Sequence, residues 1–397
     1  MNRKEDIVIV GAARTPQGKL MGQLATVSAV ELGGAAIEAA LDRAGVYPES
    51  VDAVVMGQVI QAGAGQNPAR QAAVAGGIPL GAHAVTVNKV CLSGLSAIIE
   101  ASRLLQLGEA EVVIAGGQES MSNAPHLLAG SRAGHLYGDT LLTDSVAHDG
   151  LTDAFDQESM GINTDRANAM LGVKRAQQDR AAADSHRRAA AAQDAGNFDA
   201  EIAPVKVPQR RGPAEFVNKD EGIRPDTSEE SLSKLRPAFS PTGTITAGNA
   251  SPLTDGAAAV VLTTRSYAEE RGLKILAALG ACGQTAGPDT SLPDKPARAI
   301  TKALSTAGWR VDQLDFVEIN EAFASVAIHS AAQLGLGMDR VNVNGGAIAL
   351  GHPIGASGAR VVVSAVYELQ RRGGGKTAVA LCGGGGQGEA LLLSLAR

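Results

Sequence analysis

The chain is poor in aromatic residues and in cysteine. Only 3% of its 397 residues are aromatic, and its three cysteines are Cys91, Cys282 and Cys382. These cysteines lie far apart without CxxC spacing, so the sequence predicts neither a disulfide framework nor a zinc site, and a reducing, cytoplasmic setting is expected. With few aromatic rings, the cores must be built from Ala, Val, Leu and Ile, with close backbone contacts at glycines. This composition favours packed α/β layers over an aromatic-rich β-sandwich.

Long apolar runs and an excess of positive charge are also missing. No stretch approaches the 18 or more apolar residues of a membrane span, so we expect no membrane segment. The formal net charge is -6 and the sequence pI is about 5.7, which gives no argument for nucleic-acid binding. The short apolar run at 7–10 ends at a glycine and indicates a first strand rather than a signal peptide. The length alone predicts two or more cores.

The most informative feature is an internal repeat. The segment at 36–54 reads AIEAALDRAGVYPESVDAV, the segment at 299–317 reads AITKALSTAGWRVDQLDFV, and eight positions match without a gap. The apolar spacing in each copy predicts an amphipathic helix that ends at a glycine, Gly45 or Gly308. A short strand is expected to follow each helix.

The similarity between the two copies continues along the chain. Ser93-Gly94 in the first copy corresponds to Ser357-Gly358 in the second, which carries about eight extra residues before them. A predicted helix and then a strand closing on glycines follow in both copies. Two copies of one unit indicate two similar α/β domains packed about a pseudo-twofold axis.

The chain between the copies has a different character. Residues 121–252 are rich in polar residues, with two helical tracts near 163–196 and extended pieces around 201–220. Such an insertion is a common location for binding loops. We therefore expect an N-terminal α/β domain at 1–120 completed by 253–275, an inserted loop domain at 121–252 that binds ligand, and a C-terminal α/β domain at 276–397.

Cys91 and His352 occupy corresponding places in the two copies. Cys91 lies where an extended run meets a predicted helix, and the positive end of a helix lowers a thiol pKa. A small buried hydrophobic residue explains Cys91 equally well. A single histidine is more often structural, but His352 lies between Gly351 and Pro353, with little core to pack against. If the pseudo-twofold axis brings the two helix starts together, His352 reaches Cys91 and forms a cysteine–base pair.

Two further predicted strands end in reactive or polar groups. Cys382 precedes four glycines whose backbone N–H groups suit an oxyanion, although a tight turn with an inert thiol is an alternative. Asn320 ends a strand at the carboxyl edge, where α/β proteins usually bind ligands. A helix N-cap explains Asn320 equally well. The remaining histidines are scattered, so no metal site is predicted.

Together these segments resemble the thiolase family. CLSG at 91–94, NEAF at 320–323, GHP at 351–353 and CGGG at 382–385 are similar to the four active-site signatures of that family, in family order. The likeness runs from residue 11 to the C-terminus and includes GGQESMS and ITAGNASPLTDGAAA. It implies a duplicated, five-layered αβαβα architecture with an inserted loop domain.

The resemblance implies a reversible Claisen condensation of two acetyl-CoA to acetoacetyl-CoA and CoA. His352 would take the proton of Cys91, whose thiolate attacks an acyl-CoA and holds the acyl group. Cys382 would exchange the proton α to the second thioester. The enolate oxygen would lie against His352 and a water held by Asn320, and the N–H groups of Cys91 and Gly384 would form a second oxyanion hole. No metal is implied, and no cofactor beyond the substrate coenzyme A.

The resemblance further implies that the insertion binds coenzyme A and supplies contacts of a homotetramer, a dimer of dimers. Arg224 would offer a cation to the adenosine end, although a solvated loop charge is the alternative, and Phe239 and Leu253 would form apolar walls. The implied binding residues are Met160, Arg224, Ala238, Phe239, Ala247, Gly248, Ser251, Leu253 and Phe323.

One segment departs from the family pattern. Short-chain biosynthetic members commonly have His-Met-Gly where this chain has Ser159-Met160-Gly161. Met160 still favours a pocket closed to long acyl tails, but the histidine contact is absent, so a degradative 3-ketoacyl-CoA thiolase of broader chain length is the alternative. A non-catalytic acyl-CoA carrier would not need Cys91, His352 and Cys382 together. A fatty-acid type ketosynthase would carry two histidines, or a histidine and an asparagine, in place of the histidine and second cysteine.

Overall fold

The N-terminal half is an α/β unit around a buried first strand. The computed structural model describes residues 5–209 and 211–397, so residues 1–4 of the predicted N-terminal domain and Arg210 of the insertion lie outside the described residues. The elements of this half are β1 (Ile7–Arg14), β2 (Gly18–Lys19), α1 (Ala29–Ala44), β3 (Ala53–Gly57), α2 (Pro68–Ala75), β4 (His83–Val87), α3 (Ser93–Leu107), β5 (Val112–Glu119), β10 (Thr254–Thr264) and α7 (Arg265–Glu270). All eight residues of β1 are buried because β1 lies between β10 and the second half.

The C-terminal half repeats this plan. Its elements are β11 (Ala277–Ala286), α8 (Lys295–Ala307), β12 (Phe316–Ile319), α9 (Ala324–Leu334), α10 (Ala347–Leu350), α11 (Ser357–Arg371), β13 (Gly375–Gly383) and β14 (Gln387–Leu395). In the first half β1 pairs antiparallel with β10, β10 antiparallel with β5, and β5 parallel with β3. In the second half β11, β14, β13 and β12 pair in the same sequence of directions. The internal repeat predicted from the sequence is therefore confirmed.

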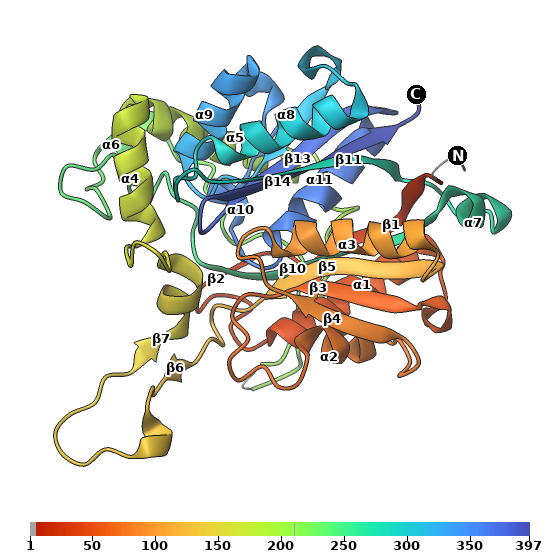
Figure 1. The fold of residues 1–397 in the computed structure, drawn as a ribbon, viewed down its shortest axis with the longest axis horizontal. Coiled ribbons are helices and arrows are strands. Elements are labelled where there is room, and N and C mark those ends of the chain that lie inside the picture. Colours follow the sequence, from red (N-terminus) through yellow and green to blue (C-terminus); the bar gives the residue numbers. More distant parts are fainter. Residues whose placement is uncertain (1–4, 210) are drawn as a thin grey trace.

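The two halves stack into five layers (Figure 1). Helices α3 and α11 pack against each other in the middle, between the two half-sheets, and share one apolar core with both. Helices α1 and α2 cover the outer face of the first half-sheet, and α8 and α9 cover that of the second. The expected α/β class and duplicated αβαβα architecture are confirmed. Along one edge, β1 and β11 join the half-sheets through the pairs Val8↔Ala278 and Ile9↔Ala277, giving the strand order β12-β13-β14-β11-β1-β10-β5-β3-β4.

Glycines at corresponding positions let the two middle helices meet. A Cβ on Gly94 would lie 2.8 Å from the backbone N of Ala359, and a Cβ on Gly358 would overlap the backbone N of Leu95. The glycines predicted to end the first helix of each copy also do so. Gly45 has φ 65° and Gly308 has φ 67°, the left-handed conformation of a helix C-cap.

One helix of the middle layer is more apolar than the sequence analysis indicated. The stretch Val90–Leu107, which contains α3, is long and apolar enough to cross a membrane by length and composition, although no such stretch was expected. Of these residues, 56% are buried inside the protein, and α3 lies in the middle layer. We therefore interpret it as a core helix, whose apolar character reflects contact with a half-sheet and with α11.

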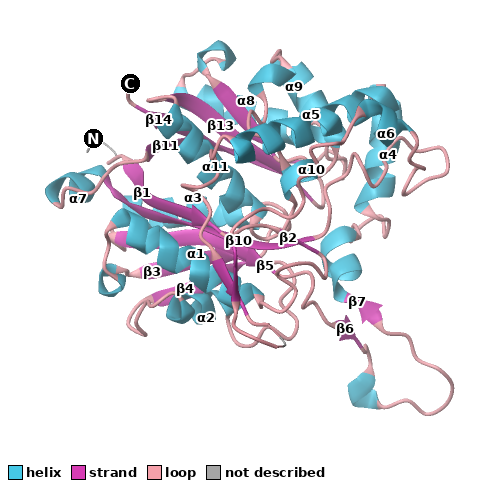
Figure 2. Ribbon diagram, turned by 180° about the vertical axis from the view of Figure 1, so that it is seen from behind, coloured by secondary structure: helices cyan, strands magenta, loops and turns pink. Residues whose placement is uncertain are grey.

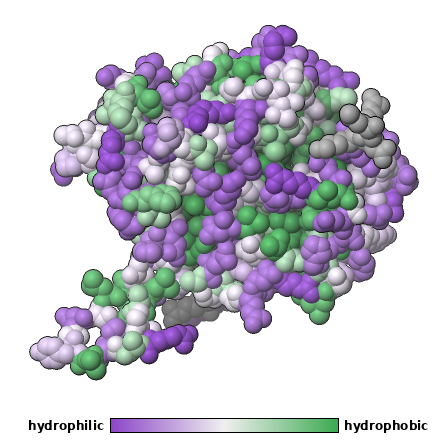
Figure 3. Space-filling view, viewed as in Figure 1, coloured by the Kyte–Doolittle hydropathy of each residue, from purple (hydrophilic) through white to green (hydrophobic). Residues whose placement is uncertain are grey.

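The insertion has the expected two helices and extended pieces. Its elements are β6 (His126–Leu127), β7 (Thr143–Asp144), α4 (Met160–Leu171), α5 (Arg175–Asp194), β8 (Val205–Val207), β9 (Glu215–Val217) and α6 (Glu229–Ser233). Strands β6 and β7 form the base of an arm that projects from the body in two opposite views (Figures 1 and 2). Figure 3 shows hydrophobic residues among hydrophilic ones on this arm, and Leu136 and Leu141 are fully or almost fully exposed. The predicted domain boundaries at 120/121, 252/253 and 275/276 stay a prediction.

Candidate active site

Cys91 lies in a tight loop just before α3. The preceding Val90 has φ 52°, a left-handed conformation that turns the chain sharply at the thiol. The half-buried Cys91 has its own backbone N–H and that of Gly384 near its sulfur, and both favour the thiolate. Burial nevertheless raises the pKa of the Cys91 thiol to about 12, because leaving water disfavours the thiolate more than these N–H groups favour it. The expectation of a lowered pKa was therefore wrong, and the thiol needs a base.

The hydrogen bonds of His352 define which ring nitrogen carries a proton. Ser357 Oγ lies 2.9 Å from the Pro353 carbonyl oxygen, to which its single proton is donated, and 2.5 Å from His352 Nδ1. The Ser357 oxygen must then accept from Nδ1–H, which leaves the lone pair on Nε2. The backbone N–H of His352 donates to Thr254 Oγ1 at 3.0 Å.

His352 lies next to the apolar cluster that contains Cys91. Leu253 forms a β-bridge with His352, and Leu253, Ile354 and Cys91 belong to the same cluster. Burial, and secondarily the charge of Arg360, lowers the pKa of His352 to about 3. The imidazole is thus neutral near pH 7 and able to accept a proton.

Asn320 contacts the free nitrogen of His352. Its Nδ2 lies 3.5 Å from His352 Nε2, and its backbone N–H donates to the Ala380 carbonyl at 3.0 Å. Helix α9 begins at Ala324 with Phe323 as its N-cap, so the helix-cap interpretation of Asn320 was wrong. The Asn320 side chain is fully buried and available to the pocket.

Cys382 and the glycine turn after it approach the Cys91 loop from the second half. Burial raises the pKa of Cys382, and a charge on the nearby Cys91 raises it further. A Cβ on Gly384 would lie 3.5 Å from the Val90 side chain and 3.8 Å from Met160 Sδ. The structure therefore brings the two cysteines, Gly384 and Met160 together, with His352 and Asn320 beside them.

The expected coenzyme A residues divide into three groups. Phe239 and Phe323 pack edge to face with ring centroids 6.0 Å apart, and a Cβ on Gly161, next to Met160, would overlap the Phe239 ring. Ser251 donates to the Ala322 carbonyl from both its backbone N–H and its hydroxyl, each at 3.1 Å, while Leu253 adjoins His352. The remaining residues lie on loops of the insertion. The Ala238 N–H donates a hydrogen bond to the Ile245 carbonyl, and Gly248 packs against Leu232 and Leu235. Ala247 and Arg224 are exposed, and the backbone N–H of Arg224 donates to His186 Nδ1 on α5.

Family models match almost the whole chain. The model described as "Thiolase, N-terminal domain" matches residues 7–266, and "Thiolase, C-terminal domain" matches residues 273–395. The chain belongs to the thiolase family. The expected resemblance is thereby confirmed.

Named relatives agree with this membership. A probable acetyl-CoA acetyltransferase of Mycolicibacterium smegmatis is 56% identical over 97% of this chain and 100% of its own length. The acetyl-CoA acetyltransferase of Chromobacterium violaceum is 51% identical over 97% of this chain and 98% of its own. The crystal structure of the Bacillus anthracis acetyl-CoA acetyltransferase superposes with a TM-score of 0.96 at 39% identity, covering 99% of this chain and 100% of the other. The expectation of an acyltransferase of the thiolase family is confirmed.

Sequence reasoning missed several side chains that hold this thiolase site together. Glu119 accepts hydrogen bonds from the backbone N–H groups of Val59, Ile60 and Gly355 at 3.0, 3.1 and 2.9 Å, and so ties the first copy to the loop of His352. Arg360 is fully buried, and its Nη2 lies 3.5 Å from Asn320 Oδ1. Glu119 stands in a segment that the resemblance had singled out, but its partners lie in distant parts of the sequence.

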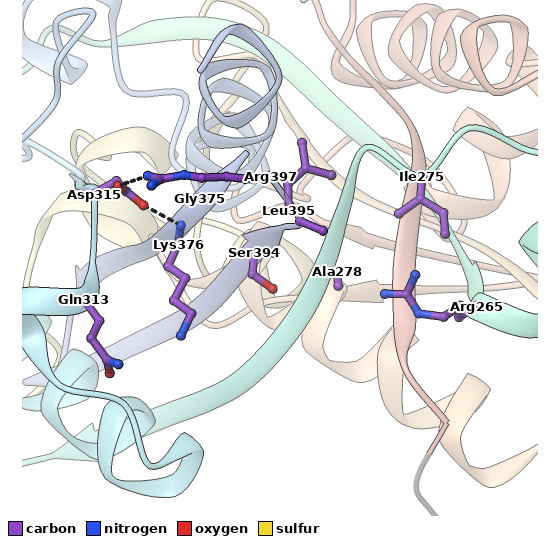
Figure 4. Close-up of a pocket in the computed structure, with 11 residues that line it drawn as sticks. Arg265, Ile275, Ala278, Gln313, Asp315, Gly375, Lys376, Ser394, Leu395 and Arg397 are labelled. Atoms are coloured by element: carbon purple, nitrogen blue, oxygen red, sulfur yellow. Dashed lines mark hydrogen bonds and ion pairs between the residues drawn. The ribbon is translucent and has the colours of Figure 1, made fainter. Parts of the chain in front are cut away.

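A second hollow lies away from the candidate active site. It has a volume of about 780 Å³, and Arg265, Lys376, Asp315 and Arg397 are among its lining residues (Figure 4). Its described lining contains none of the predicted site residues. Asp315 pairs with Arg397, and Lys376 lies over the Trp309 ring, so these charges are largely satisfied within the protein.

Proposed function

We propose that this thiolase condenses two acetyl-CoA to acetoacetyl-CoA and CoA, reversibly, through an acyl-Cys91 intermediate. The observation that carries the proposal is that the half-buried Cys91, the buried Cys382 and a neutral histidine lie close together, contributed by both copies of the repeat. Without a base, the high thiol pKa would keep Cys91 protonated near pH 7. A neutral imidazole beside it supplies the base.

In the first half-reaction, Cys91 becomes acylated. His352 Nε2 takes the Cys91 proton while the sulfur attacks the thioester carbonyl, a carbon–sulfur bond forms, and the bond to the CoA sulfur breaks. His352 then returns the proton to the departing CoA thiolate. The Ser357 contact keeps the proton of the neutral ring on Nδ1, so that Nε2 is free to perform both transfers.

In the second half-reaction, a carbon–carbon bond forms. His352 Nε2, free again, takes the Cys382 proton, and the Cys382 thiolate then takes the proton α to the carbonyl of the second acetyl-CoA. The enolate oxygen is held by the Nε2–H of His352 and by a water bound to Asn320. The enolate carbon attacks the acyl carbon, the bond to the Cys91 sulfur breaks, and the Cys91 thiolate regains its proton from His352. The N–H groups of Cys91 and Gly384 stabilise the oxyanion, and removing one such donor typically costs about 3–4 kcal/mol of barrier.

The insertion is proposed to bind coenzyme A without any further cofactor. The Phe239–Phe323 pair and Leu253 offer apolar walls to the pantetheine beside the catalytic cluster, and Arg224 offers a cation to the adenosine end. Ala238, Ala247, Gly248 and Ser251 are small enough to let the ligand approach their backbone.

Acyl chain length is the open choice between two thiolase activities. Met160 adjoins Gly384 and limits the room for an acyl tail, which supports the acetyl-specific function. Ser159 instead caps α4, its Oγ accepting from the Ile162 N–H at 3.3 Å, so the side chain at this position does not make the contact of the family histidine. This vacant contact favours the second candidate, a degradative 3-ketoacyl-CoA thiolase of broader range.

The decisive experiment is the intact mass of the full-length protein after mixing with acetyl-CoA. We expect the mass to rise by one acetyl group in the wild type and to stay unchanged in Cys91→Ser. Thiolysis of acetoacetyl-CoA is then compared with that of a longer 3-ketoacyl-CoA. A preference of about tenfold or more for the longer substrate would replace the acetyl-specific proposal with the second candidate.

We also propose a homotetramer in a reducing, cytoplasmic setting. Exposed leucines on the arm between β6 and β7 support a contact between copies, because large exposed apolar groups usually mark interaction surfaces. The three free cysteines support the reducing compartment.

A further inference from the structure

Lys89 and Glu389 form an ion pair that joins the Cys91 loop to the opposite half of the molecule. Lys89 Nζ lies 3.0 Å from Glu389 Oε1, although 300 residues separate the two along the chain. The Glu389 side chain is fully buried, and that of Lys89 is 25% exposed. The chemistry proposed above assigns no role to either charge.

The same carboxylate also holds the chain after Cys91. Glu389 Oε2 accepts a hydrogen bond of 2.5 Å from Ser96 Oγ on α3, and Oε1 accepts another from Gln284 on β11. Lys89 precedes Cys91 by two residues and Ser96 follows it by five. One buried carboxylate therefore fixes both sides of the nucleophile loop.

The loop held in this way contains a strained residue. A β-branched side chain such as Val90 rarely adopts a φ of 52°, because its Cβ then crowds the neighbouring backbone. Local bonds support this turn: the Val90 N–H donates to Asn88 Oδ1 at 3.0 Å, and Ser93 Oγ donates to the Val90 carbonyl at 2.6 Å. Such strain persists only where the surroundings over-determine the conformation, and it concentrates at functional sites.

Glu389 connects the Cys91 loop to the Gly384 turn, which carries the proposed oxyanion donor in the other half. It lies on β14, directly after the turn that carries Gly384. The Gly384 turn packs against Val90 beside the Cys91 sulfur, so the two loops must keep their separation for both thiol and oxyanion contacts to form. The Lys89–Glu389 ion pair joins the same two segments a second time.

We propose that Lys89 and Glu389 are positioning residues for acyl transfer. They hold the Cys91 loop at a fixed distance and orientation relative to the Gly384 turn. The inference rests on the proposed acylation of Cys91. Misplacement of a reacting group by about 1 Å costs about 100-fold in rate. Loss of the pair should therefore slow acylation while leaving the coenzyme A contacts of the insertion in place.

The test uses full-length Lys89→Met, Glu389→Gln and the double variant, with acetyl-CoA as the probe. The rate of Cys91 acetylation is followed by rapid quench and intact mass, alongside steady-state kcat and KM. We expect the single variants to lose roughly 10- to 100-fold in acetylation rate and kcat, with KM for acetyl-CoA changed less than about threefold. The double variant should be no slower than the slower single variant, because each single variant already loses the Lys89–Glu389 interaction.

Two controls separate positioning from general stability. Lys234→Met removes the exposed Lys234–Glu230 pair on the insertion, whose side chains are 70% and 83% exposed, and should leave the rate unchanged. Lys89→Arg keeps the charge and should recover most of the lost rate. Circular dichroism melting reports the folded fraction of every variant.

The outcomes are distinguishable. Slow acetylation in folded Lys89→Met and Glu389→Gln, with rescue in Lys89→Arg, supports the proposal. Wild-type rates in both single variants, or losses that match their unfolded fractions, would overturn it. If the wild type itself takes up no acetyl group, the proposed function fails, whatever the variants do.

Discussion

At the scale of single residues, the environment of His352 makes it a base over an unusually wide pH range. A pKa of about 3 leaves the ring neutral well below the ordinary histidine value of 6.5, because burial and Arg360 oppose the charged form. We expect the rate of Cys91 acetylation to show no acid limb from this histidine between about pH 5 and 7. The rate is measured at several pH values in this range by quenching the reaction at set times and determining the intact mass of the protein. A limb centred near 6.5 that vanishes in His352→Asn would contradict the assignment.

The Glu119 carboxyl gives a second residue-level prediction, this time for stability. Burial raises its pKa from 4.5 to about 7. Between these values the folded protein keeps a proton that the unfolded chain has released, so the contribution of Glu119 to stability falls as pH rises through this window. This pH dependence should disappear in Glu119→Gln. The difference in free energy of unfolding, wild type minus variant, should therefore fall by up to about 3 kcal/mol from pH 5 to pH 8.

Urea unfolding at the two pH values checks this prediction. Loss of hydrogen bonds to the Val59, Ile60 and Gly355 N–H groups in the variant adds a term that does not depend on pH and cancels in the comparison. A difference between wild type and Glu119→Gln that stays constant from pH 5 to pH 8 would show that the carboxyl titrates normally.

At the scale of elements, a buried charge cluster fastens the insertion to β1. Arg14 Nε lies 2.7 Å from Glu201, and its Nη1 lies 2.7 Å from Asp220, all with side chains fully buried. Arg14→Met would leave two buried carboxylates without their cation, and we expect a loss of about 3–5 kcal/mol in the free energy of unfolding. Denaturant unfolding measures it. Arg180→Met, which breaks an exposed pair with Glu229, should cost less than about 1 kcal/mol, and similar losses in both variants would refute the argument.

The elements themselves were predictable where local chemistry decides them. Gly45 and Gly308 end their helices because only glycine adopts a left-handed φ without strain, and the Ala-Gly signal is visible in the sequence. The partners of Cys91 were not predictable in the same way. Its pKa depends on burial between two halves, and Lys89 meets Glu389 across 300 residues, so neither follows from nearby residues.

The motifs predicted which residues form the candidate site, but they did not predict its internal geometry. The sequence indicated that Cys91 and His352 share a pocket because they occupy corresponding positions in a repeat. The sequence did not indicate which ring nitrogen of His352 carries the proton. That assignment depends on the Ser357 hydroxyl, which already donates its proton to the Pro353 carbonyl. Hydrogen-bond direction is a property of the folded loop rather than of residue type.

At the scale of the whole molecule, the projecting arm predicts how copies associate. Leu136 and Leu141 are 102% and 88% exposed at residues 128–142, an arrangement that leaves apolar surface in water unless another copy covers it. Replacing both with serine should lower the oligomer mass, measured by light scattering after gel filtration, without altering the circular dichroism spectrum. Leu107→Ser changes a leucine of 73% exposure on the body and should leave the mass unchanged. An unchanged mass in the arm variant would place the contact elsewhere.

The glycine crossing of α3 and α11 restricts how such a duplicated protein can evolve. Gly94 and Gly358 set the thickness of the shared central layer, and that thickness sets the distance between one half's sulfur and the other half's imidazole. A bulkier residue in either helix would push the halves apart and separate the reacting groups, even though it touches neither. The two halves are therefore free to diverge on their outer helices, whereas their inner helices can change only as a matched pair.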